Sequence, residues 1–147
     1  MSVEIGEISE DHKKIAWAMA LGGFIPFLGL SASAFFGFTL GLPIDPTTLY
    51  IYWSLAILSF LGGIRWGLAI ANNPIDIRNL AWSVVPCIIA WFSLLLPDGY
   101  TITALLLLYL IQGYWDFIYF KDKAWFANIR ATLTVLVAST HVLTLFS

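Results

Sequence analysis

The chain has 147 residues, of which 60% are hydrophobic and only 11% are charged, whereas a soluble domain has about 25% charged residues. This composition excludes an ordinary soluble domain and predicts an integral protein of the lipid bilayer. The net charge of -2 and the lack of any cluster of Lys and Arg exclude nucleic acid as a partner and a polybasic surface for acidic lipid.

Short polar breaks divide the chain into a polar amino-terminal tail, residues 1–14, and a single apolar domain, residues 15–147. The tail is unlike a secretory signal or a mitochondrial transit peptide, because its acidic residues precede the first basic pair. Within the domain each apolar segment must be helical, since the bilayer core has no water to satisfy an open backbone. The helices are predicted over residues 15–40, 48–71, 79–96, 100–120 and 124–146.

The predicted fold class is therefore all-α, a five-helix transmembrane bundle with up-and-down topology. The basic residues outside the helices all lie on one side of this topology, and the connections on the other side carry none. By the positive-inside rule the amino terminus is in the cytoplasm and the carboxyl terminus outside, in what we expect to be a bacterial inner membrane. The five basic residues are Lys13, Lys14, Arg78, Lys121 and Lys123.

This orientation makes a labelling prediction. Single cysteines introduced at Asn73 and Lys123 are expected to react with a reagent confined to the cytoplasmic side, and one at Asp98 with a reagent outside. Labelling of position 98 from the cytoplasm would overturn the orientation.

Three charged residues, Arg65, Asp116 and Arg130, lie inside the predicted helices. A charge at the centre of a bilayer costs about 2.5–3.5 kcal/mol on insertion scales, so each needs a partner or water. At 1.5 Å per residue all three lie within roughly 6–10 Å of the cytoplasmic interface. Either they form one polar cluster approachable from the cytoplasm, or each arginine reaches the headgroups independently. Asp116 has the further alternative of pairing locally with Lys121 or Lys123.

Two features near Arg65 point to a ligand. Gly62 and Gly63 leave room for a headgroup or another backbone beside the arginine. The aromatic rings of Trp66, Trp115 and Tyr119 are compatible with a nearby quinone or lipid headgroup, and Trp66 joins the three charges in the candidate anion site.

Small residues recur at four-residue spacing in the first two predicted helices. Such residues let helices approach closely in lipid, where no hydrophobic force holds helices together. We predict that the two faces pack against each other, and a homo-oligomer or a larger partner is the alternative. The residues are Gly29, Ser33 and Gly37 in the first helix and Ser59, Gly63 and Gly67 in the second.

Residues that carry chemistry are few. The chain has two histidines, His12 and His141, and one cysteine, Cys87. A metal or haem would need several ligands close together, and nucleophilic catalysis would need a nucleophile beside a base. We therefore expect no metal, no cofactor and no enzymatic activity, and interpret His141 as an interfacial residue.

The segment Ser59 to Gly67, which contains Leu-Gly-Gly-Ile-Arg-Trp-Gly, resembles a family of small uncharacterised membrane proteins of bacteria and mitochondria. The resemblance continues at residues 22–29, at Val84-Val85-Pro86 with Ala90-Trp91, and at residues 130–134, so it covers nearly the whole chain. It implies a five-helix inner-membrane protein and supplies no activity, substrate or cofactor.

Two functions stay open. The first is a structural, accessory or assembly component of a membrane complex, which requires a protein partner. The second is binding of an anionic lipid, a quinone or a small anion near the cytoplasmic leaflet by Arg65 and Arg130. Transport is less favoured, because the chain lacks the internal repeats common in transporters.

Overall fold

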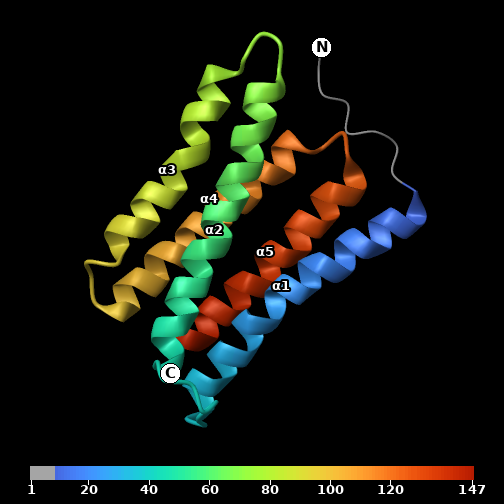
Figure 1. Ribbon diagram of the computed structural model, residues 1–147. Coiled ribbons are helices and arrows are strands. Elements are labelled where there is room, and N and C mark those ends of the chain that lie inside the picture. Colours follow the sequence, from blue (N-terminus) through green and yellow to red (C-terminus); the bar gives the residue numbers. More distant parts are fainter. Residues whose placement is uncertain (1–8) are drawn as a thin grey trace.

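The computed structural model describes residues 9–147 as five α-helices joined by short connections (Figure 1). This confirms the all-α, five-helix class. Residues 1–8 of the predicted tail lie outside the described residues, and the rest of the tail belongs largely to the first helix. The helices are α1 (Glu10–Phe36), α2 (Pro46–Ala71), α3 (Ile77–Ser93), α4 (Asp98–Tyr119) and α5 (Ala124–Leu145).

Local chemistry explains why α1 begins and ends earlier than predicted. Ser9 accepts a hydrogen bond from the backbone N–H of His12 at 3.4 Å, which caps the helix before Glu10. Lys13 pairs with Glu10 across one turn at 2.6 Å. The helix ends at Gly37, whose φ of 70° is the left-handed conformation that terminates helices.

Aspartates begin the next two helices. Asp45 accepts a hydrogen bond from the backbone N–H of Thr48 at 2.9 Å and precedes a proline at the first position of α2. Asp76 does the same for α3 through the backbone N–H of Asn79 at 3.1 Å. These caps keep both connections short.

Four of the helices, α1, α2, α4 and α5, are long and apolar enough to cross a membrane. The α3 helix has 17 residues, the lower limit of the roughly 17–25 residues of transmembrane helices. The chain is thus an integral membrane protein.

The helices form a closed ring. Each packs against the next in the sequence, α1 packs against α5, and α2 also contacts α4 across the middle. The start of α1 and the α2–α3 and α4–α5 connections lie at one end of the bundle, and the carboxyl terminus lies at the other (Figure 1). We call the first of these the basic end, because it holds Lys13, Lys14, Arg78, Lys121 and Lys123.

Phe27 of α1 lies at the centre of the core, where four helices meet. Its buried ring contacts Tyr50 of α2 and Tyr109 of α4 edge to face, with ring centroids 5.6 and 6.0 Å apart. It also lies 6.1 Å from the ring of His141 on α5. These aromatic contacts fix the positions of the helices that carry the buried charges.

The predicted contact between the two small-residue faces is not formed. A Cβ atom added to any of the four glycines would meet no neighbouring atom within 4 Å. The two serines make other contacts instead: Ser33 donates to the carbonyl of Phe38, and Ser59 bonds to the carbonyl of Leu55 and to Sγ of Cys87 on α3. The four glycines are Gly29, Gly37, Gly63 and Gly67.

The close approaches occur at two other glycines. A Cβ atom on Gly62 would lie 2.5 Å from the backbone oxygen of Ser83, so only glycine lets α2 meet α3 there. A Cβ atom on Gly113 of α4 would collide with the side chain of Thr134 on α5. Glycines therefore do let helices approach closely, as expected, but they lie on helix faces other than those predicted.

The neighbouring glycines of α2 provide a matched test. Gly62→Ala is expected to destabilise the protein by about 1–3 kcal/mol, because the added methyl group presses on a backbone carbonyl that cannot turn aside. Gly63→Ala should be neutral or stabilising, since it faces open space and alanine is the better helix former. Thermal unfolding of both variants in one detergent checks this difference, and equal stabilities would contradict it.

Candidate functional site

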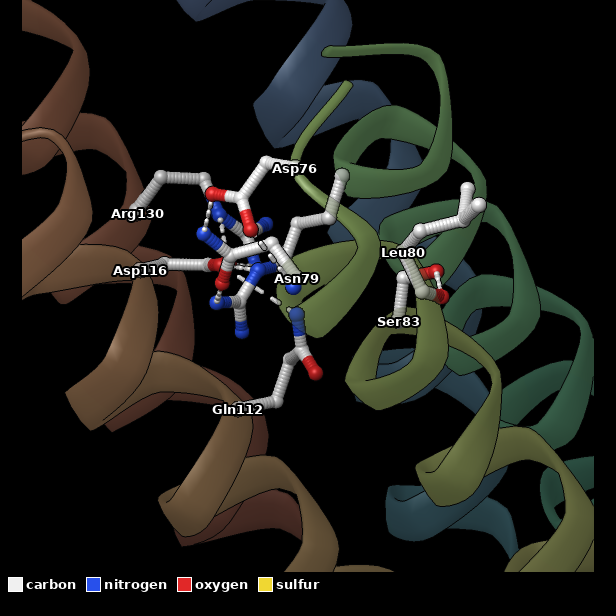
Figure 2. Close-up of polar contacts among 8 residues, drawn as sticks. Asp76, Asn79, Leu80, Ser83, Gln112, Asp116 and Arg130 are labelled. Atoms are coloured by element: carbon white, nitrogen blue, oxygen red, sulfur yellow. Dashed lines mark hydrogen bonds and ion pairs between the residues drawn. The ribbon is translucent and has the colours of Figure 1, made fainter. Parts of the chain in front are cut away.

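A buried ion pair joins α4 to α5 near the basic end. The Nε and Nη2 atoms of Arg130 both donate to Oδ2 of Asp116, the Nε hydrogen bond being 2.9 Å long. Arg130 is 6% exposed and Asp116 is 2% exposed. Figure 2 shows the two side chains meeting from their separate helices. Charge-assisted hydrogen bonds of this kind are the strong ones.

The second oxygen of Asp116 serves two further groups. Gln112, one turn earlier on α4, donates its Nε2 to Oδ1 at 3.2 Å (Figure 2). The Nε of Arg65, from α2, lies 3.9 Å from the same oxygen. The structure thus brings Arg65, Asp116 and Arg130 into one cluster, which we call the charged cluster.

Arg65 is held on its other sides by α3 and α4. Its Nη2 donates to Oδ1 of Asn79 at 3.3 Å. Its guanidinium carbon lies 5.4 Å from the ring centroid of Trp115 and 5.6 Å from that of Tyr119, both within cation–π range. The side chain is nevertheless incompletely satisfied, because its buried Nε and Nη1 atoms make no hydrogen bond with the described residues.

Asn79 links the charged cluster to the connection at the basic end. Besides accepting from Arg65, it donates its Nδ2 to Oδ2 of Asp76 at 2.5 Å (Figure 2). The backbone and side-chain hydrogen bonds from Asn79 lower the pKa of Asp76 below its ordinary value. Asp76 therefore stays ionised and orients the amide of Asn79 toward Arg65.

Trp66 does not join the charged cluster. Its side chain is 42% exposed, because successive residues of a helix point about 100° apart and Arg65 faces inward. Of the three predicted aromatic residues, Trp115 and Tyr119 are the ones that contact Arg65.

Gln112 and Asn79 were not anticipated from the sequence. Gln112 had a usable signal, since a polar residue four positions before Asp116 shares its helix face. Asn79 had none of that kind, because its contact with Arg65 depends on how α2 and α3 pack.

The charged cluster carries more positive than negative charge. Asp116 is the carboxylate that forms ion pairs with both arginines among the described residues. Two guanidinium groups, each 6% exposed, therefore share one carboxylate. The charged cluster itself therefore has a surplus of about one positive charge, and the nearest further carboxylate, Asp76, reaches Arg65 through Asn79.

A second polar network lies at the opposite end of the bundle. Both nitrogens of His141 are engaged, Nδ1 with the hydroxyl of Tyr50 at 2.8 Å and Nε2 with that of Ser54 at 2.9 Å. Tyr109 donates to the backbone oxygen of Ser54 at 2.7 Å. His141 is fully buried and is a core residue, because the α5 face that carries it is turned toward Tyr50 and Ser54 of α2.

Comparisons with known proteins agree with a membrane protein. Residues 12–146 match the family of proteins of unknown function that is described as DUF3429. Transmembrane protein 69 of Xenopus tropicalis is 36% identical over 136 residues, which cover 86% of this chain and 52% of that protein. The chain thus spans about half the length of that relative. No solved structure matches the chain.

Proposed function

Because this chain belongs to the DUF3429 family of proteins of unknown function, we propose its function from the charged cluster itself. The charged cluster binds the anionic group of a small molecule or lipid inside the bundle, near the basic end. Arg65 and Arg130 supply the positive charge. The observation that carries this proposal is the surplus of buried guanidinium over carboxylate.

Two energetic terms favour a bound anion. An unpaired cation costs up to about 2.5–3.5 kcal/mol at the centre of a membrane helix, and a second anion near Asp116 would offset the part of this cost that applies at the depth of the charged cluster. Each buried donor without an acceptor costs a further 1–3 kcal/mol or so, and Arg65 has two such nitrogens. The planar guanidinium group matches the paired oxygens of carboxylates and phosphates.

In our proposal the role of the charged cluster is binding rather than catalysis. The basic end, which receives the anion, faces the cytoplasm. The accessory or assembly role also expected from the sequence depends on a protein partner. We prefer ligand binding because contacts and charges within this chain support it without any partner.

Paired ligands that differ only in head charge test the proposal. The protein is purified in an uncharged detergent, and native mass spectrometry measures bound palmitate and bound hexadecanol. We expect palmitate to bind about tenfold more tightly or better, because removing one partner of a buried charge pair costs 2–5 kcal/mol or so. Arg65→Gln should abolish this preference while keeping the Arg130–Asp116 pair, which preserves the fold.

Arg78→Gln is the matched control, since Arg78 is an exposed arginine near the same end. It should leave the preference for palmitate unchanged. Equal binding of palmitate and hexadecanol would contradict the proposal. A stoichiometric protein partner in place of acidic lipid would favour the accessory role.

A further inference from the structure

An apolar groove of about 350 Å³ lies between α1, α2 and α5. Its walls are mainly aliphatic and aromatic side chains. Along α1 it extends from Ala16 to Phe27, a rise of roughly 16 Å at 1.5 Å per residue. That length is close to half of the roughly 30 Å hydrocarbon core, so the groove has the depth of one leaflet. Representative wall residues are Ala20, Phe24, Leu61, Leu133 and Val137.

Arg130 is the charged residue of the groove wall and also a member of the charged cluster. The other polar wall residues already use their hydroxyl protons. Tyr109 donates to the backbone oxygen of Ser54 at 2.7 Å, and Thr134 donates to that of Arg130 at 2.8 Å. An acidic group in the groove would therefore be attracted by the guanidinium group of Arg130.

Building on the proposed function, we infer that the bound anion is the carboxylate of a single-chain amphiphile, a long-chain fatty acid. The carboxylate lies at Arg130, which lines the groove, and adds the negative charge that the charged cluster lacks; Arg65 does not line the groove and attracts the carboxylate by its charge. The hydrocarbon chain runs away from the basic end toward Phe27 and Val137, and its first part occupies the roughly 10 Å of groove between Arg130 and Val137.

Size and charge together select this occupant. A volume of about 350 Å³ is at the small end of ligand pockets, which range over roughly 300–1,000 Å³. One apolar chain suits it better than the two chains of a phospholipid. A neutral amphiphile would fill the groove equally well, but it would not neutralise the surplus positive charge of the two arginines.

A groove-filling variant and a matched control on the same helix test the inference. Ala20→Phe places a ring inside the groove, whereas Ala18→Phe places it on an exposed face that does not line the groove. We expect Ala20→Phe to weaken palmitate binding by about tenfold or more, since a single methylene group in an apolar pocket already changes affinity by 10–200-fold or so. Ala18→Phe should bind palmitate like the unmodified protein.

The outcomes separate this inference from the proposed function. If Ala20→Phe retains full palmitate affinity while Arg65→Gln still loses its preference for the acid, the groove is not the chain site and only this inference fails. If neither variant changes binding, both fail. Displacement of palmitate by equimolar dipalmitoyl phosphatidylglycerol would show a two-chain occupant and overturn the single-chain assignment. Should Ala20→Phe not fold, Leu133→Trp fills the same groove from α5.

Discussion

Asp116→Asn is expected to destabilise the protein by about 3–5 kcal/mol, the usual effect of breaking a buried ion pair. The substitution preserves the shape of the side chain, so the loss comes from charge. Arg130 would lose the carboxylate that accepts two of its hydrogen bonds, and Arg65 would lose the same counter-ion. Thermal or denaturant unfolding in one detergent measures the change.

Asp122→Asn provides the control for this substitution. Asp122 lies exposed in the α4–α5 connection, where a surface substitution changes stability by no more than about 0.5 kcal/mol. Similar unfolding curves for the two variants would mean that Asp116 does not hold the arginines in place.

The second large effect is expected at the opposite end of the bundle. His141→Ala should lower the free energy of unfolding by about 3 kcal/mol or more, because it opens a cavity among packed rings and removes two hydrogen bonds. The hydroxyl of Ser54 would lose its partner at Nε2, and Tyr50 would lose Nδ1 while keeping its hydrogen bond with Thr140. Loss of these two contacts between α2 and α5 should appear in thermal unfolding as a lowered midpoint.

His12→Ala is the matched histidine control, since His12 is exposed in the first turn of α1. It should unfold close to the unmodified protein. If His141→Ala were tolerated equally well, the network of Tyr50, Ser54 and His141 would contribute nothing to stability.

The sequence predicted the helices well because prolines, glycines and charges interrupt the apolar segments. It also placed Arg65, Asp116 and Arg130 at one depth, since depth follows from position within a helix and the fixed rise per residue. Residue identity and helix length were sufficient for both inferences.

The sequence could not predict how each helix is rotated about its axis. Gly62 and Gly63 are adjacent, yet only Gly62 faces another helix. Likewise Arg65 is buried while Trp66 is exposed. Small and apolar residues surround these helices almost evenly, so their pattern does not mark the inner face. The burial of His141 was missed for the same reason.

A double-mutant cycle across the charged cluster tests our central claim, that two arginines share one buried carboxylate. Thermal unfolding is measured for Asp116→Asn alone, for Arg65→Gln and Arg130→Gln alone, and for each arginine change combined with Asp116→Asn. We predict that part of the loss from Asp116→Asn returns in each combination, with coupling beyond the 0.5 kcal/mol or so within which distant sites add. Strict additivity for both arginines would contradict the shared cluster.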